Sequence, residues 1–345
     1  MKYQLILSLT IIVLLITSCA SSPEEVTAQT SVAATTSAAN WTRTPTPTAT
    51  YTATPTITFT PTHTPTLTPL PTATLLGGWT TENIICASDL GTGNLEIFSV
   101  SVDGNHRINL TNSPAYEYSP ILSPDKAKIA FVSSNGSNPE IYVMNVDGSN
   151  PTNVSNTGGF DYWHNWSPDG SKIVFESQDE EYDFDIYVVD VGSGNLTNLT
   201  NSPFMEQFPI WSPDGTKIAF ASLREGRYYK IHVMNVDGSN NLQLTSGRGG
   251  DFPIAWSPDG EKILFSSDRD GEDFELYIMN ADGTDPRKLT KNTIDEADSQ
   301  WSPDGTKIFA WPFEGEPFII NSDGSDFGDL EGLPGSISIS NNRCP

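Results

Sequence analysis

Basic residues are scarce in this 345-residue chain. It has 18 lysines and arginines against 43 aspartates and glutamates, which gives a formal net charge of −25 at pH 7. An acidic chain repels phosphate backbones, so this composition argues against a nucleic-acid-binding protein and favours cations or basic protein surfaces as partners. The first 80 residues contain two basic and two acidic side chains, so the excess of acid belongs to the rest of the chain.

Histidines and catalytic motifs are also rare. The chain has four histidines. It contains neither the Gly-x-Ser-x-Gly turn of serine hydrolases nor the His-Glu-x-x-His helix of zinc proteases. The sequence therefore predicts a protein that is not an enzyme.

A long apolar run occurs at the N-terminus, from Leu5 to Ile16. Its length suits a secretory signal and is short for a membrane span. The following Ile16-Thr17-Ser18-Cys19 resembles a bacterial lipobox, in which the cysteine is acylated and becomes the mature N-terminus. We therefore expect residues 1–19 to be a lipoprotein signal peptide, with Cys19 carrying lipid such as palmitate. The alternative is an ordinary signal peptide with a chance cysteine.

Residues 20–78 have the composition of a disordered stalk. Threonine occupies every even position from Thr42 to Thr68, and prolines are interleaved with it. Proline removes backbone donors and disfavours both helix and sheet, so this segment is expected to be extended. We expect an exported protein, anchored to a bacterial membrane by its N-terminal lipid and facing the periplasm or the outside. An inert linker is the alternative for the stalk.

One short motif recurs through the rest of the chain. Trp-Ser-Pro-Asp-Gly and a degenerate Leu-Ser-Pro-Asp-Lys copy begin 44, 45, 45 and 45 residues apart, at Leu122, Trp166, Trp211, Trp256 and Trp301. So regular a period indicates copies of one supersecondary unit. Each tryptophan is expected to pack between neighbouring units, and each aspartate to stabilise a turn.

The segment from Glu206 to Thr245 shows the pattern within one unit. Phe208–Trp211, Lys217–Ser222, Lys230–Val236 and Leu242–Leu244 are short apolar or alternating runs, separated by turn residues. Proline presets φ in such turns and glycine accepts positive φ. Four short strands in about 45 residues are typical of one β-propeller blade.

The second strand of this unit recurs six times, beginning at Ile84, Ile129, Ile173, Ile218, Ile263 and Ile308. The first copy has no Trp-Ser-Pro-Asp-Gly before it, but residues 336–342 alternate where a seventh copy would fall. We expect this segment to supply the innermost strand of the first blade and to close the ring. The sequence thus predicts an all-β, six-bladed, monomeric β-propeller of four-stranded blades over residues 79–345.

These repeats resemble the TolB-like, WD40-like β-propeller repeat family over about residues 82–342. Five Ser-Pro-Asp copies carry the resemblance, together with three Ile/Leu-x-x-Met-Asn-x-Asp-Gly segments that begin at Ile141, Ile231 and Leu276. The resemblance implies a six-bladed propeller that binds a protein partner of the cell envelope through the propeller.

A carboxylate stands five residues before the tryptophan position in five of the repeats: Glu117, Asp161, Glu206, Asp251 and Glu296. We expect these residues on the loops that enter the innermost strands, in a ring around one mouth of the channel. Such a ring could bind Ca²⁺ through oxygen ligands or could dock basic groups. Alternatively, each carboxylate accepts backbone hydrogen bonds and fixes its own loop. We assign no other metal or cofactor.

Aromatic side chains that differ from blade to blade accompany these carboxylates. They are Tyr116, Tyr118, Tyr162, Trp163, Phe204, Phe208 and Phe252. Of these, Tyr118, Tyr162, Trp163 and Phe252 are assigned to a binding site for an envelope or extracellular protein or glycan. His164 beside them is the histidine to test for an acid or base role. Plugging of the channel is the alternative for the aromatics, and the alternatives for the protein are a polysaccharide lyase or hydrolase that uses the mouth carboxylates, or a structural spacer.

The three cysteines are Cys19, Cys86 and Cys344. Cys86 replaces a core phenylalanine of the repeat, and Cys344 follows the closing segment. An exported protein can form disulfides, so a Cys86–Cys344 bridge that pins the ring shut is one possibility. The repeat register alone does not bring the two clearly within bonding distance.

Overall fold

The computed structural model describes residues 83–329, apart from 90–92, 102–104, 137, 179–182, 225, 272, 313–316 and 327. The chain divides into two units, Met1–Gly78 and Trp79–Pro345. The predicted signal peptide, the lipidated Cys19, the stalk, the closing segment 336–342 and Cys344 lie outside the described residues. Within the described part, no helix has the length and apolar character needed to cross a membrane.

Six antiparallel sheets follow one another along the chain. Blade 1 has three described strands, β1 (Asn83–Ser88), β2 (Glu96–Ser101) and β3 (Arg107–Asn109). Blade 2 has β4 (Tyr116–Leu122), β5 (Lys128–Ser134), β6 (Glu140–Asn145) and β7 (Thr152–Asn153), and blade 3 has β8 (Phe160–Trp166), β9 (Lys172–Gln178), β10 (Phe184–Asp190) and β11 (Leu196–Asn198).

The last three sheets repeat this order of four strands. Blade 4 has β12 (Glu206–Trp211), β13 (Lys217–Ser222), β14 (Lys230–Asn235) and β15 (Leu242–Gln243). Blade 5 has β16 (Asp251–Trp256), β17 (Lys262–Ser267), β18 (Glu275–Asn280) and β19 (Arg287–Lys288), and blade 6 has β20 (Glu296–Trp301), β21 (Lys307–Pro312), β22 (Phe318–Asn321) and β23 (Gly328–Asp329).

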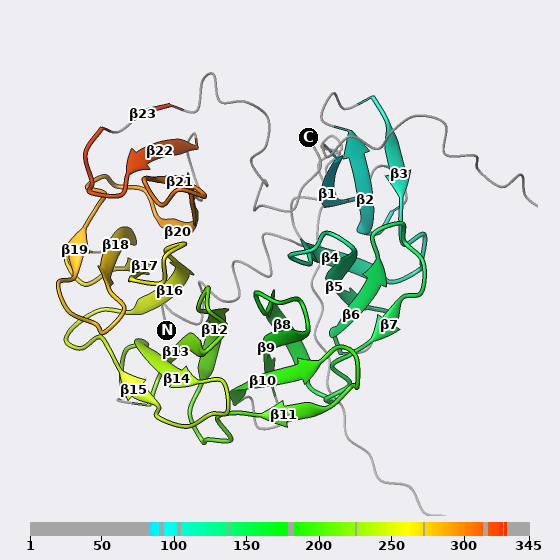
Figure 1. Ribbon diagram of the computed structural model, residues 1–345, viewed down its shortest axis with the longest axis horizontal. Coiled ribbons are helices and arrows are strands. Elements are labelled where there is room, and N and C mark those ends of the chain that lie inside the picture. Colours follow the sequence, from blue (N-terminus) through cyan, green and yellow to red (C-terminus); the bar gives the residue numbers. More distant parts are fainter. Residues whose placement is uncertain are drawn as a thin grey trace, which may run out of the picture. The chain divides into compact units, whose positions relative to one another are not determined.

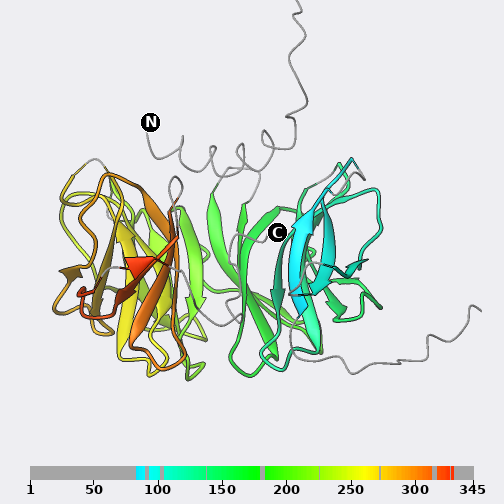
Figure 2. The same cartoon turned by 90° about the horizontal axis from the view of Figure 1, so that it is seen from above.

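The sheets are arranged as the blades of a propeller. Viewed along the axis, β4, β8, β12, β16 and β20 lie innermost, and the fourth strand of each blade lies outermost (Figure 1). From the side, the strands run roughly along the axis (Figure 2). The predicted six-bladed β-propeller is confirmed. The four strands of blade 4 begin and end within two residues of the predicted bounds.

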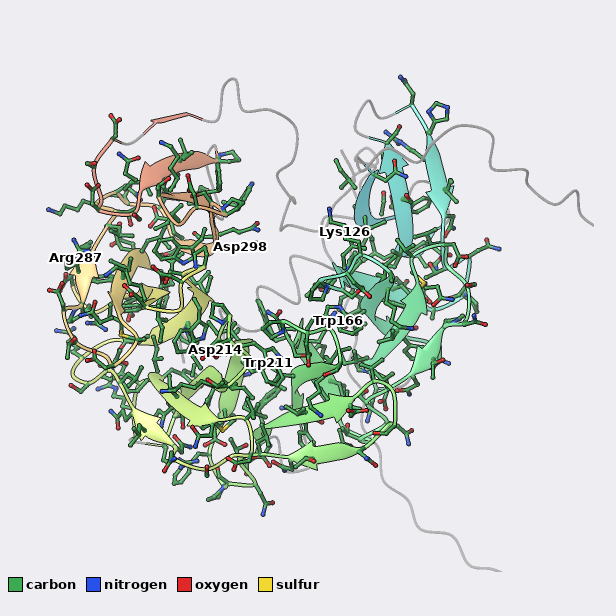
Figure 3. All side chains as sticks on the ribbon, in the orientation of Figure 1. Lys126, Trp166, Trp211, Asp214, Arg287 and Asp298 are labelled. Atoms are coloured by element: carbon green, nitrogen blue, oxygen red, sulfur yellow. The ribbon has the colours of Figure 1, made fainter. Side chains whose placement is uncertain are left out.

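The core lies between successive blades. Trp211 on β12 packs against Val174 and Ile186 of the preceding blade, and its indole Nε1 donates to the Asn165 carbonyl at 3.2 Å. Trp166 makes the same contact one blade earlier, with the Ile121 carbonyl at 3.1 Å. Trp166 stands on β8 and Trp211 on β12, both inner strands, and Figure 3 labels both residues. The repeated tryptophan is therefore an inter-blade packing residue, as predicted.

The Ser-Pro-Asp-Gly turns connect the first and second strands of blades 3 to 6, and Ser-Pro-Asp-Lys does so in blade 2. In blade 4 the Ser212 hydroxyl donates to Asp214 Oδ1 at 2.6 Å, and the Thr216 amide donates to the same oxygen at 3.0 Å. Gly215 has φ +69°, a conformation that favours glycine. The aspartate is thus a turn residue, as predicted. These turns mark one end of the propeller; the end where the inner strands begin is called the mouth below.

Candidate binding site

The five repeated carboxylates occupy the first or second position of an inner strand. The sequence placed them on the preceding loops and around the channel, but the structure buries them: Glu117 is 3% exposed, and Asp161, Glu206, Asp251 and Glu296 are 0% exposed. A residue of a paired strand points to one face or the other of its sheet, and here the carboxylates point to faces that are covered.

Three of the carboxylates are held by neutral donors. Ser113 donates to Glu117, the Thr157 hydroxyl donates to Asp161 Oδ1 at 2.7 Å, and the Thr290 hydroxyl donates to Glu296 Oε2 at 2.8 Å. Burial raises the pKa of Glu117, raises the pKa of Asp161 to about 6 and raises the pKa of Glu296 to about 7. Desolvation of the charged form outweighs these hydrogen bonds.

The other two carboxylates form buried ion pairs. Arg224 Nη2 lies 2.6 Å from Glu206 Oε1. Asp251 accepts from Lys230 Nζ at 2.8 Å and from Arg269 Nη2 at 2.7 Å. These cations are supplied by the loops and strand starts of blades 4 and 5, so the charge of both acids is compensated within the fold.

The structure does not bring the five carboxylates together. Each has its own set of partners, and these come from its own blade or from the segments just before it, with Lys230 of blade 4 reaching Asp251 of blade 5. Among the described residues, no group of three or more histidine, cysteine, aspartate or glutamate side chains could hold a metal ion. The donors named above are side-chain hydroxyls, lysine and arginine. They hold the carboxylates through side-chain contacts and not through the backbone hydrogen bonds that the alternative predicted.

Aromatic side chains form a continuous series across the mouth of blades 3, 4 and 5. The ring centroids of Trp163 and Phe208 are 4.8 Å apart, and those of Phe208 and Phe252 are 5.4 Å apart, both edge to face. Phe252 also contacts Tyr229 at 5.2 Å and Phe274 at 5.7 Å. Trp163 is 50% exposed. Tyr229 and Phe274 are buried. We call Trp163, Phe208 and Phe252 the aromatic surface.

Two β-bulges present this surface. The pairing of β8 with β9 shifts register between Tyr162 and Asn165, and that of β12 with β13 shifts between Gln207 and Ile210. The first bulged residue is Trp163 in β8, with φ +47°, and Phe208 in β12, with φ +57°. Ser119 at the equivalent position of blade 2 has φ +52°, so the left-handed bulge recurs in the fold, and blades 3 and 4 place bulky aromatic side chains on it.

The remaining predicted site residues lie beneath or beside the aromatic surface. Tyr118 and Tyr162 are half-buried; burial raises the pKa of both, that of Tyr162 to about 12. His164 is 3% exposed, and burial lowers its pKa to about 4. A buried neutral imidazole lacks the access that an acid or base at the mouth needs. Cys86 is buried and disulfide-bonded, but Cys19 and Cys344 lie outside the described residues, so the Cys86–Cys344 pairing stays a prediction.

Sequence reasoning missed three residues of this region: Glu176, Tyr229 and Phe274. Glu176 Oε2 accepts a hydrogen bond from the Phe208 amide at 2.8 Å. A signal for Glu176 was present, because the position equivalent to it holds Val132 in blade 2 and Ala221 in blade 4. Tyr229 and Phe274 also share a register, because each stands two residues before a repeated motif that begins at Ile231 or Leu276, so the sequence held a signal for them too.

The fold and the site define this chain as a six-bladed β-propeller with an aromatic mouth. Its sequence matches the family described as the TolB beta propeller domain over residues 80–207 and 180–336. The chain belongs to this family. The comparison with curated proteins gives no match.

Solved structures share the fold. TolB from Acinetobacter baumannii superposes with a TM-score of 0.56 and 22% identity, covering 72% of this chain and 64% of that one. A provisionally assigned TolB from Agrobacterium tumefaciens has a TM-score of 0.53 and 28% identity, covering 68% of this chain and 92% of that one. An oligogalacturonate lyase from Vibrio parahaemolyticus has a TM-score of 0.58 and 15% identity, covering 76% and 78%. The present chain thus spans under two thirds of the Acinetobacter protein's length.

Proposed function

We propose that this protein is a non-catalytic binding module of the cell envelope, which holds a protein or glycan partner on the aromatic surface at its mouth. The observation that carries the proposal is the unbroken contact of Trp163, Phe208 and Phe252 across three blades. Aromatic side chains are enriched at interaction hot spots because they offer a large contact area at a small cost in conformational entropy.

The side chains on the bulges support binding over a purely structural spacer. The same left-handed bulge holds Ser119 in blade 2, whereas blades 3 and 4 place Trp163 and Phe208 on it and leave Trp163 half exposed. A spacer gains nothing from exposing this aromatic area. The repeated positions are occupied by the same residue types in each blade, whereas the aromatic surface differs between blades. That contrast is typical of a rigid scaffold with variable recognition residues.

The charges of the mouth support binding over catalysis. Glu206 and Asp251 are ion-paired, and Asp161 and His164 are buried. The lyase or hydrolase alternative would employ these groups as acid and base at the surface, and a solved oligogalacturonate lyase shares the fold. At 15% identity that likeness concerns the fold alone.

The location follows from the sequence and is part of the same proposal. A lipid on Cys19 and a Thr/Pro stalk would hold the propeller away from the membrane. Solved TolB structures are among those that share the fold, which supports a place in the envelope and a partner there.

Site-specific crosslinking of the full chain in intact cells tests the proposal. A photoreactive phenylalanine analogue replaces Trp163, and in a matched control it replaces Leu242, a 63% exposed residue on the outer strand β15. We expect a discrete protein or glycan adduct from position 163 and none from position 242. Equal adducts at both positions, or none at 163 together with no binding on a glycan array, would contradict the proposal.

A further inference from the structure

Basic side chains gather on one part of the mouth of this acidic chain. Arg224 and Arg227 stand in the loop between β13 and β14, Arg248 in the loop between β15 and β16, and Arg269 in the loop between β17 and β18. Arg224 and Arg269 hold the buried carboxylates of blades 4 and 5. Arg227 and Arg248 are exposed, and neither forms an ion pair with any residue that the structure describes. In a chain with a net charge of −25, uncompensated arginines favour binding of an anion.

Blade 4 also reverses a charge that the repeat keeps in other blades. In blades 1 to 5 a threonine or serine hydroxyl accepts from the amide of one equivalent strand residue, which fixes the register: Ile97, Ile141, Ile186, Ile231 and Leu276. The residue before it is an acid in four blades and a lysine in blade 4: Glu96, Glu140, Asp185, Lys230 and Glu275. The lysine is therefore a departure from the repeat at one blade.

The acid at this position binds the loop that leads to the next blade. Glu96 Oε2 accepts from the Thr111 hydroxyl at 2.7 Å and from the Ser113 amide at 3.1 Å. Asp185 makes the same two bonds in blade 3, at 2.7 and 3.0 Å. Glu275 accepts from the loop amide of blade 5 at 3.0 Å. In three blades, a carboxylate of the chain itself thus occupies an anion-binding loop.

Blade 4 keeps the donors of this loop and has a lysine in place of their acid. Thr245 and Gly247 take the positions of Thr111 and Ser113. The Thr245 hydroxyl accepts from a strand amide as in the other blades. Across the described residues, neither this hydroxyl nor the Gly247 amide donates to an acceptor. Both donors are therefore available to an anion from outside the chain.

Lys230 adds positive charge to the same place. Its ammonium group donates to the Gly249 carbonyl at 2.7 Å and to Asp251 Oδ2 at 2.8 Å, which uses two of its three hydrogens. Asp251 also pairs with Arg269, so one carboxylate faces two cations. The three side chains together keep one positive charge.

A pocket of about 330 Å³ brings these groups together. It is lined by Arg227, Tyr228, Lys230, Gln243 and Gly247. The guanidinium carbon of Arg227 lies 5.6 Å from the centre of the Tyr228 ring. The lining contains two cations and no carboxylate, and it includes none of the residues of the aromatic surface. Its volume is at the lower end of the range for small-molecule sites, which suits a ligand of the size of one sugar unit.

We propose that this pocket binds the carboxylate of an acidic sugar unit, in the manner in which the loops of blades 1, 3 and 5 bind the chain's own carboxylates. Arg227 and Lys230 pair with the carboxylate, and Gly247 donates its amide. Tyr228 and Gln243 offer a hydroxyl and an amide to the sugar hydroxyls. An acidic side chain of a partner protein would bring the charge without these hydroxyls, so the lining favours the sugar. The pocket is a second site, and the inference does not depend on the proposed function.

Saturation-transfer NMR of the full chain with D-glucuronate and D-glucose tests this inference. The two sugars differ at C6, where glucuronate has a carboxylate and glucose a hydroxymethyl group. At constant ionic strength we expect glucuronate to bind with a Kd on the order of 1 mM and glucose to give no saturable signal. N-acetylglutamate amide carries the charge on a peptide side chain and should bind more weakly than glucuronate. Tighter binding of this compound, equal signals from the two sugars, or no saturable glucuronate signal would overturn the inference.

Matched variants locate the site. Arg227→Ala should weaken glucuronate binding about tenfold, whereas Arg248→Ala, which removes an exposed arginine that does not line the pocket, should leave it unchanged. Lys230→Glu restores the acid of the repeat and should abolish binding. Four other blades carry an acid there, so we expect this variant to fold, and thermal unfolding checks it. Equal effects of the two arginine variants would contradict the assignment.

A further variant keeps this result distinct from the proposed function. Trp163→Ala alters the aromatic surface and leaves the pocket intact, so it should bind glucuronate like the wild type. Loss of glucuronate binding in Trp163→Ala would place the sugar on the aromatic surface and overturn the assignment to this pocket.

Discussion

At the scale of single residues, the degenerate repeat explains a local strain. Lys126 takes the place of the turn glycine in blade 2 and has φ +59°, whereas the four intact turns have glycine at φ +69° to +73°. An L side chain in this region is disfavoured by contact of its Cβ with the backbone. The turn geometry is thus imposed by the surrounding hydrogen bonds and not by the residue that occupies it.

Exchange of these two residue types should therefore have opposite effects in the two turns. Lys126→Gly should raise the free energy of unfolding by about 0.5–1 kcal/mol, and Gly215→Lys should lower it by about 1 kcal/mol or more, because only glycine adopts this φ without strain. Urea unfolding of the full chain measures both. If Lys126→Gly lowered stability, the strain assigned to this turn would be wrong.

At the scale of the strand and its loop, the repeated carboxylate has neutral partners in one blade and charged partners in another. In blade 2, Glu117 accepts from serine hydroxyls, whereas in blade 5, Asp251 neutralises Lys230, whose side chain is 4% exposed. Removal of one partner from a buried ion pair leaves the other charge uncompensated, while loss of a neutral hydrogen bond has a smaller effect.

Isosteric neutralisation at the two positions should therefore differ in cost. Asp251→Asn should lower the free energy of unfolding by about 3–5 kcal/mol, because Lys230 and Arg269 lose their counter-charge. Glu117→Gln should change it by no more than about 1 kcal/mol, since its donors keep an acceptor. Equal costs in urea unfolding would show that the carboxylates act alike, as a shared ligand site would require.

At the scale of the whole propeller, the pKa values of the buried acids and of the exposed turn acids are shifted in opposite directions. Burial raises the pKa of Asp161 to about 6, of Glu296 to about 7 and of Glu176 to about 8. In contrast, hydrogen bonds from serine, threonine and backbone donors lower the pKa of the turn residues Asp169 and Asp304 to about 2. The folded protein therefore binds more protons than the unfolded chain above about pH 4.5, and fewer below about pH 4.

These shifts predict greatest stability near pH 4–5. Between about pH 4.5 and 8 the buried acids ionise in the unfolded chain first, so stability falls as pH rises; below about pH 4 the turn aspartates protonate in the unfolded chain first, so stability falls as pH decreases. A loss of about 3 kcal/mol would lower Tm by roughly 6–12 °C at pH 8. Thermal unfolding from pH 3 to 9 measures this.

The control is a triple variant, Asp161→Asn with Glu176→Gln and Glu296→Gln, which removes the three raised groups. Its Tm should change much less between pH 5 and 8 than that of the wild type. A wild-type Tm that rises from pH 5 to 8 would contradict the assignment of these acids as buried and neutral.

The sequence by itself determined the blade. The 45-residue period, the turn residues and the alternation of apolar positions are local properties, since they follow from φ preferences and from the side to which each strand residue points. They predicted the strands of blade 4, the turn role of Asp214 and the packing role of Trp211 (Figure 3).

Only the tertiary structure decided what the mouth is. The five carboxylates share a register, but their burial and partners depend on loops and on neighbouring blades, which the repeat does not encode. Likewise, the aromatic surface joins Trp163, Phe208 and Phe252 from three blades, and Glu176 bonds to an amide 32 residues away. Contacts between blades form only when the chain folds and the blades pack side by side. A pattern that repeats along the sequence therefore could not show which of the residues that depart from it lie together.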